Sequence, residues 1–431
     1  MGMLHQIAMC PIESFHSCHL IGCKYSNIPS NCKVDMTKYS EKFVFLWRMK
    51  CLYLFNPEND MALAYGGPYY MPPSNARKMA HDLAALPLWY ASSEGEVWLP
   101  EFRQAAWMKE CGLSPKAWGG GSLRAHYDRL HPWGWSASMV RRLQEAGVEA
   151  SCCPTEGQIQ RIRTLSARAT AVEVLHSFEG DGVMGESCML YSLDETIRWC
   201  KERTRSLLKA PWSGSGRGIQ PVEKELPLPL QGWTNHILKT QGYVVGEPYY
   251  NKVVDFAMEF LACQGKVSFV GYSFFETDAR GIYKENLLAA DETIEERLSV
   301  YVPRESLDRV REHLEGKLAE VIGDAYDGYL GVDMMVCRTE EGFAVHPCVE
   351  INLRMNMGVV SRLLYDHYIT PGVQGRFVIE YYPVPGEALR MHRAMQERHP
   401  LVLQDGRIRQ GYFSLTPVFE ETSYQAYVLV Q

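Results

Sequence analysis

The feature that most constrains the fold is a pair of apolar segments within residues 329–352 that carry polar side chains at matching positions. Both segments have strand composition, and the polar stretch that ends at Gly342 between them can reverse the chain. We therefore expect an antiparallel hairpin in which Asp333 lies opposite Glu350 within about one residue, with their Cβ atoms roughly 5 Å apart. Asn352 would follow on the same face, because side chains in a strand alternate.

Three oxygen-bearing side chains that converge on one point predict a site for a divalent cation. Mg²⁺ takes one or two carboxylates from a protein and completes its shell with water and substrate phosphate, and a carboxylate pair without a cation would repel itself. Pro347 weakens the register argument, since proline removes a ladder donor and belongs on edges or bulges. The alternative is an ordinary hairpin whose acidic residues face water.

A second feature lies upstream, where a short apolar strand delivers Lys209 and then a glycine-rich loop, residues 212–218. Glycines at 214, 216 and 218 allow backbone N–H groups to turn towards an anion, and Lys209 supplies a point charge for phosphate oxygens. The spacing fits neither the Walker loop nor the dinucleotide-binding fingerprint, so those two folds are disfavoured. A plain surface turn is the alternative for the loop taken alone.

In this order and at this separation, the two features resemble the ATP-grasp superfamily of carboxylate–amine and carboxylate–thiol ligases. The resemblance covers about residues 156–365 and implies ATP and Mg²⁺ as cofactors, with Mn²⁺ as an alternative ion. It implies that Lys209 contacts the ATP phosphates, that Asp333, Glu350 and Asn352 hold the metal, and that Arg354 steadies the transferred phosphoryl group. The loop that would close over the phosphates contains Ser213, Gly214, Ser215, Gly216, Arg217 and Gly218.

The resemblance also assigns residues around the nucleotide. Glu247 and Tyr249 would edge the adenine, and Asp255 would accept from the ribose hydroxyls; solvent-facing strand positions are the alternative for Glu247 and Asp255. Arg168 would be a further phosphate contact, although family members often have lysine there. A solvated helix face is the alternative for Arg168.

Two further segments are candidates for the substrate. A strand near residues 49–55 leads into a polar loop with Asn56, Asn59 and Asp60, and ligands collect beyond the carboxyl ends of strands in open α/β sheets. An Asn/Asp helix cap is the alternative for this loop. Arg280, in a polar loop, could meet a substrate carboxylate, with a solvated loop residue as its alternative.

The expected fold class is α/β and α+β: a pre-ATP-grasp α/β domain followed by a two-lobed ATP-grasp fold. We expect a leader over residues 1–48, poorly ordered or upstream of a native start at Met49, and then the α/β domain over 49–155. Lobe A of the ATP-grasp fold would span 156–240, lobe B with the metal site 241–365, and a strand-rich extension 366–431. Within lobe B, apolar residues spaced by three and four over 304–322 predict an amphipathic helix.

The amino-acid composition and charge limit the classes of partner that we expect this chain to bind. With 44 basic against 51 acidic residues the net charge is −7, which leaves no electrostatic footprint for nucleic acid. No long apolar run or export signal is apparent, so neither a membrane span nor secretion is expected, and the chain should stay in the cytoplasm. The 13 cysteines, without a repeating spacing, are expected to be reduced thiols.

The first functional hypothesis is a ligase that activates a small-molecule carboxylate as an acyl phosphate, which an amine or a thiol then attacks. The second is a kinase in which the reaction stops after phosphoryl transfer. The third is a nucleotide-binding scaffold without turnover. The partners would be small carboxylate and amine substrates, with a homodimer as one option for assembly.

Overall fold

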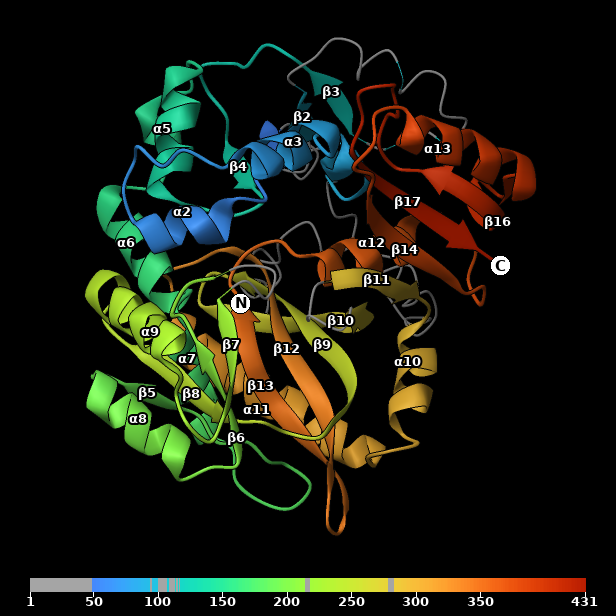
Figure 1. Ribbon diagram of the computed structural model, residues 1–431. Helices are drawn as coiled ribbons and strands as arrows, with labels where there is room; N and C mark the ends of the chain where they lie inside the picture. The colour runs from blue at the N-terminus through green and yellow to red at the C-terminus, as the bar shows by residue number, and fades with distance from the viewer. Residues whose placement is uncertain are drawn as a thin grey trace, which may run out of the picture. The chain divides into compact units, whose positions relative to one another are not determined.

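The computed structural model describes residues 49–93, 95–99, 107, 113, 115, 117–213, 218–277 and 283–431 (Figure 1). The expected leader lies outside this range, and the described residues belong to one compact unit that begins at Met49. Among the helices of the described residues, none is both long enough and apolar enough to cross a membrane.

The first region is a parallel sheet with the strand order β3-β2-β1-β4. Its first strand is buried at every position, as is typical of parallel sheets that are covered on both faces. The strands are β1 (Cys51–Leu54), β2 (Gly95–Trp98), β3 (Trp118–Gly120) and β4 (Arg129–Pro132), and the helices are α2 (Asn59–Tyr65), α3 (Ser74–Asp82), η2 (Leu86–Trp89), α5 (Ala137–Glu145) and η3 (Ala150–Cys152).

The second region is a small antiparallel sheet with the order β5-β8-β6-β7. Two helices precede it, α6 (Glu156–Leu165) and α7 (Arg168–His176). The strands are β5 (Cys188–Leu190), β6 (Arg205–Lys209), β7 (Ile219–Glu223) and β8 (Val244–Pro248), and the helices between them are α8 (Leu193–Lys201) and α9 (Leu228–Gln241). These two helices and the sheet share an apolar core of their own.

The third region is a nine-stranded antiparallel sheet with the order β13-β12-β9-β10-β11-β14-β17-β16-β15. The strands are β9 (Lys252–Cys263), β10 (Lys266–Thr277), β11 (Tyr283–Leu288), β12 (Gly328–Thr339), β13 (Gly342–Asn352), β14 (Gly375–Tyr381), β15 (Val402–Gln404), β16 (Arg407–Ser414) and β17 (Tyr424–Val430). The helices are α10 (Asp291–Leu298), α11 (Arg304–Ile322), α12 (Met357–Tyr368) and α13 (Glu387–Arg398). The amphipathic pattern over 304–322 is indeed one helix, α11, and its apolar face is buried against the sheet.

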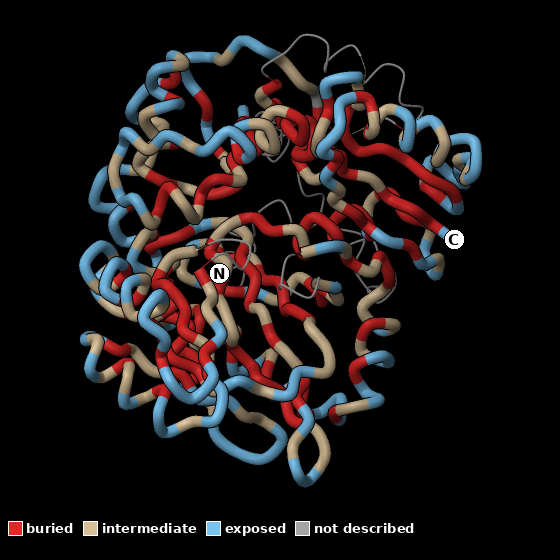
Figure 2. Tube along the Cα trace, viewed as in Figure 1, coloured by how far each residue is buried: buried red, intermediate tan, exposed pale blue. Residues whose placement is uncertain are grey.

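The strands after residue 366 continue the sheet that contains β9 to β13, because β14 pairs with β11. Figure 2 shows buried positions along β14, β16 and β17, whereas β15 and much of α13 are exposed. The structure thus combines a parallel α/β sheet with two antiparallel α+β sheets, which confirms the expected fold class. The domain boundaries within residues 49–431 remain predictions.

Candidate active site

The expected hairpin is present as β12 and β13, and it pairs Asp333 with Glu350. Asn352 follows two residues later, is paired with Gly331, and its Nδ2 donates to Oδ2 of Asp333 at 3.1 Å. The three side chains therefore gather on one face of the sheet.

The pairing shifts just beyond this point. Met335 is paired with His346, so that two steps along β12, from Asp333, correspond to four steps along β13, from Glu350. Pro347 falls inside the irregular interval, and β13 is the edge strand of its sheet. Since a proline cannot donate to the ladder, it is accommodated by a bulge on an edge strand, and the register at Asp333 is left intact.

The environment of the hairpin favours a cation. Burial, followed by the charge of Glu350, raises the pKa of Asp333 from 3.8 to about 7. On the neighbouring strand β9, Glu259 is paired with Gly331, two residues before Asp333. Its carboxylate accepts from Nδ2 of Asn356 at 2.8 Å. Burial, together with the charge of Asp333, raises the pKa of Glu259 from 4.5 to about 8, although the hydrogen bond from Asn356 opposes the shift. Carboxylate and amide oxygens in such a place are the donors that suit Mg²⁺.

Glu259 was missed by the sequence reasoning. The signal for it is a single acid within the apolar strand Phe256–Phe260, where an ionised side chain is unfavourable unless something compensates its charge.

Arg168, the first residue of α7, contacts the hairpin. Its side chain is buried; Nη1 donates to the carbonyl of Ala210 at 2.5 Å and to Oγ of Ser213 at 2.7 Å, and Nη2 donates to Oε1 of Glu350 at 2.9 Å. The solvent-facing alternative for Arg168 is therefore wrong. The guanidinium group bonds one of the expected metal ligands, so that it neutralises part of the acidic charge there.

Lys209 and Glu247 are paired with each other. Both side chains are buried, and Nζ lies 2.5 Å from Oε2 across the neighbouring strands β6 and β8. The sequence assigned Lys209 to phosphate and Glu247 to adenine without anticipating their contact. A phosphate that approached Lys209 would compete with Glu247 for the ammonium group.

The other predicted nucleotide contacts are Tyr249, which follows β8, and Asp255, which lies on β9. Tyr249 is exposed after β8, with the guanidinium of Arg205 3.9 Å above its ring. Asp255 on β9 forms an ion pair with Lys252 and accepts from Oγ1 of Thr277 at 3.1 Å. These nucleotide roles stay predictions.

The two ends of the glycine-rich loop lie close together. A Cβ on Gly218 would lie 2.3 Å from Cβ of Ser213, so only glycine permits this close approach. Gly214, Ser215, Gly216 and Arg217 lie outside the described residues, as does Arg280.

Arg354 connects the hairpin to the first region. Its Nε and Nη2 each donate at 2.7 Å to one carboxylate oxygen of Asp60 on α2, in the bidentate geometry that arginine makes with carboxylates. Burial by itself would lower the pKa of Arg354, but the charge and hydrogen bonds of Asp60 outweigh it and raise the pKa. Arg354 is therefore held in one orientation and stays charged.

The predicted substrate loop divides into structural and pocket-facing residues. Asn56 is fully buried, its Nδ2 donates to the carbonyl of Gly134 at 2.9 Å, and its Oδ1 accepts from the N–H of Gly134 at 3.3 Å. Neither it nor Asn59 caps α2 through its side chain, since the N-cap is Glu58. Asn59 and Asp60 line a small polar pocket to which all three regions contribute; its other polar lining includes Ser166, Ser213, Glu350, Asn352 and Arg354.

No family model and no curated protein sequence matches this chain. Solved structures similar to it include a biotin carboxylase from Campylobacter jejuni in complex with β,γ-ATP (13% identity, 89% of this chain and 87% of that chain, TM-score 0.49). Another is an N5-carboxyaminoimidazole synthase from Aspergillus clavatus in complex with ADP and an aminoimidazole ribonucleotide (12% identity, 89% and 94%, TM-score 0.44). A third is the biotin carboxylase domain of a 2-oxoglutarate carboxylase from Hydrogenobacter thermophilus with MgADP, ADP and bicarbonate (15% identity, 88% and 86%, TM-score 0.44).

At these identities and TM-scores, the similar structures assign neither a family nor a reaction to this chain. In the small antiparallel sheet, β6 ends at the buried Lys209, and the glycine-rich loop follows. In the nine-stranded sheet, the hairpin of β12 and β13 pairs Asp333 with Glu350. A parallel α/β sheet precedes both lobes. This order of sheets is the one that we expected from the resemblance to the ATP-grasp superfamily.

Proposed function

We propose that this protein is an ATP- and Mg²⁺-dependent ligase that activates a small-molecule carboxylate as an acyl phosphate for attack by an amine or a thiol. The observation that carries the proposal is the in-register pair of Asp333 and Glu350, with Asn352 beside it. Glu350 and Asn352 line a pocket that Arg354 also lines. The pocket combines acidic oxygens for a metal with a fixed positive charge for an anionic substrate.

The chain's own residues would work by positioning and by charge. Asp333, Glu350 and Asn352 would hold Mg²⁺, which when bound neutralises charge that accumulates on the transferred phosphoryl group. Lys209 would contact the phosphates with Glu247 as its counter-charge, and Arg168 would exchange part of its contact with Glu350 for a phosphate oxygen. Arg354, oriented by Asp60, would face the acyl phosphate. This chemistry requires no side-chain nucleophile.

The proposal is tested by screening amino acids and small peptides for ADP formation with Mg²⁺, using the wild type, Asp333→Asn and Glu350→Gln. We expect turnover in the wild type and a loss of at least about a hundredfold in both variants, because each removes a charge that holds the metal. Glu341→Gln is the matched control, since Glu341 is an exposed acid at the turn of the same hairpin. Its activity should equal that of the wild type.

The outcomes separate the three hypotheses. A ligase releases inorganic phosphate only when both the acid and the amine or thiol are present, whereas a kinase leaves the phosphoryl group on its product. Equal rates in the wild type and both metal-site variants would eliminate the metal assignment. Binding of ATP without any turnover across the screen would favour the scaffold.

A further inference from the structure

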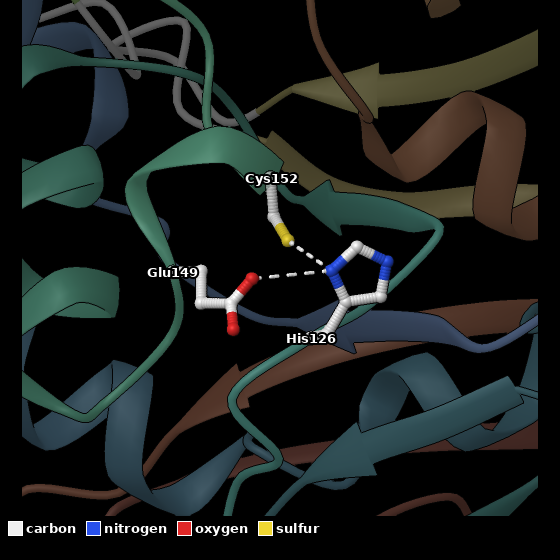
Figure 3. A group of neighbouring side chains, drawn as sticks. All are labelled: His126, Glu149 and Cys152. Carbon is white, nitrogen blue, oxygen red and sulfur yellow. Dashed lines mark hydrogen bonds and ion pairs between the residues drawn. The ribbon is translucent and has the colours of Figure 1, made fainter.

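A second cluster of metal-ligating side chains lies outside the candidate active site. It consists of His126, Glu149 and Cys152, which each offer one ligand atom, and these atoms all lie within 4.8 Å of one another. Figure 3 shows that the Cys152 thiol and a Glu149 carboxylate oxygen both point at the same ring nitrogen of His126. Both contacts to Nδ1 measure 3.4 Å.

We propose that these three residues bind a thiophilic divalent cation of the zinc type. Zinc bonds of about 2.3 Å to sulfur, about 2.05 Å to imidazole nitrogen and about 2.0 Å to carboxylate oxygen, at tetrahedral angles, place sulfur about 3.6 Å and oxygen about 3.3 Å from the nitrogen. The two measured separations of 3.4 Å lie close to those values. The donor set of nitrogen, sulfur and oxygen is also one that zinc accepts, whereas Mg²⁺ prefers oxygen alone.

The direction of the contacts favours a cation over a catalytic triad. A triad uses the two ring nitrogens of histidine separately, one towards the nucleophile and the other towards the orienting acid. Here Nδ1 alone faces both Cys152 and Glu149. A thiolate, a carboxylate and an unprotonated ring nitrogen are all lone-pair donors, so a single metal ion between them satisfies all three at once.

The backbone already holds the ligands in place. The N–H of Glu149 donates to the carbonyl of Ala125 at 2.8 Å, which ties the loop before β4 to the turn of η3. The neighbours of two ligands, Tyr127 and Val148, are buried in one apolar cluster, and Cys152 packs against it. By contrast, the side chains of His126 and Glu149 are 58% and 53% exposed, so an ion can enter from solvent and the remaining coordination position is open to water.

The site is distinct from the Mg²⁺ site of the proposed function, and the inference does not depend on that function. Its ligands come only from the first region, and its sulfur donor has no counterpart among Asp333, Glu350 and Asn352. A bound ion would clip the loop before β4 to the segment that leads into α6.

The test uses Co²⁺ as a spectroscopic probe for zinc on the full, reduced chain. We expect one equivalent of Co²⁺ to give the absorption of a thiolate–cobalt charge-transfer band, and Cys152→Ser to abolish it. His126→Asn should weaken the affinity by more than about tenfold, since removing a ligand costs more than removing an outer partner of one. Cys153→Ser is the matched control, because Cys153 is the adjacent thiol and belongs to no group of candidate ligands among the described residues. It should keep the band.

A second measurement guards against a folding defect. Zn²⁺ should raise the melting temperature of the wild type and of Cys153→Ser, but not that of Cys152→Ser, while all three melt alike without metal. A wild type without the charge-transfer band, or a band of the same intensity in Cys152→Ser, would overturn the proposal. Cobalt bound elsewhere, through oxygen or through other cysteines, gives the second of these results.

Discussion

At the residue scale, the pairs that local periodicity fixes were accessible from the sequence, and the long-range partners were not. The period of two along a strand, with one turn between the strands, determines that Asp333 meets Glu350. No local rule determines that Arg168 bonds Glu350, 182 positions later, or that Lys209 bonds Glu247. The first contact depends on how separate sheets pack, and the second on the pairing of β6 with β8, which are not consecutive in the chain. The same limit explains why Asp60 was expected to meet substrate while the structure gives it Arg354.

The Asp60–Arg354 pair leads to a prediction about catalysis. Asp60→Asn removes the charge that orients the guanidinium, so we expect a reduction of about 10- to 100-fold in the rate of Mg²⁺-dependent ADP formation. Asp60→Glu keeps the charge and should recover part of the rate. The thermal stability of both variants is measured alongside, because a variant that is slow only in proportion to its unfolded fraction would contradict a positioning role.

His346 leads to a prediction about pH. It is fully buried on β13, and neither ring nitrogen has a hydrogen-bond partner among the described residues. Burial, followed by the charge of Lys209, lowers its pKa from 6.5 to about 3. Between about pH 3 and pH 6.5, this imidazole therefore binds a proton in the unfolded chain but not in the folded chain. Its contribution to stability is complete above pH 6.5 and falls as the pH drops towards 3.

His346→Leu removes this linkage. Between neutral pH and about pH 5, the wild type should lose up to about 2 kcal/mol more unfolding free energy than the variant. Denaturant titrations at the two pH values measure the difference. His236→Gln, an exposed histidine on α9, is the control and should follow the wild type. A His346→Leu curve parallel to that of the wild type would show that the buried imidazole already takes up its proton in the folded chain.

At the element scale, helix identity was predictable where the pattern was long, as in α11, but the fit between a helix and its sheet was not. Helix α12 begins with Asn356 as its N-cap, whose Oδ1 accepts from the N–H of Val359 at 3.0 Å. Its Gly358 lies so close to the sheet that a Cβ would come within 1.9 Å of Oε1 of Glu259 and 2.7 Å of Ser273. Nothing in the sequence around residue 358 shows that the helix must approach so closely.

Two glycine substitutions of opposite effect check this packing. Gly358→Ala should destabilise the protein by about 1–3 kcal/mol, because the added methyl overlaps buried side chains. Gly316→Ala, in the interior of α11 with nothing within 4 Å of the added carbon, should stabilise it by about 1 kcal/mol through helix propensity. Unfolding free energies from denaturant titrations decide. If both substitutions changed the unfolding free energy in the same direction, the close contact at α12 would be contradicted.

At the scale of the whole molecule, the first region shares an apolar core with elements that follow it much later in the chain. One apolar cluster combines Trp89 of the first region with residues of α12 and of the strands β14, β16 and β17. Nε1 of Trp89 donates to the carbonyl of Leu415 at 2.6 Å, and its ring contacts Phe413 and Tyr368 edge-on, with centroids 5.2 and 5.3 Å away. The sequence positions differ by more than 270 residues, and no spacing rule connects them.

Because these residues form one core, we expect the first region and the strands after residue 366 to unfold together. Trp89→Ala should cost about 3–5 kcal/mol and lower the hydrogen-exchange protection of β1 and of β17 together. Trp199→Ala is the comparison, because Trp199 packs in the separate core of the small antiparallel sheet. Its effect should concentrate on β5, β6 and β8. Loss of protection confined to the first region in Trp89→Ala would instead support independent domains.

Strand β17 sits between β14 and β16, so the order of strands in space departs from their order along the chain. Among the described residues, β16 is joined to β14 through β17, which is synthesised after it, apart from an isolated bridge between Ile408 and Ile369. On the ribosome, the hairpin of β15 and β16 must wait with one side unpaired until the later strand emerges and fills the gap. Assembly of this sheet is therefore a late event, and the exposed edge of the waiting hairpin is the point at which a chaperone would protect the nascent polypeptide.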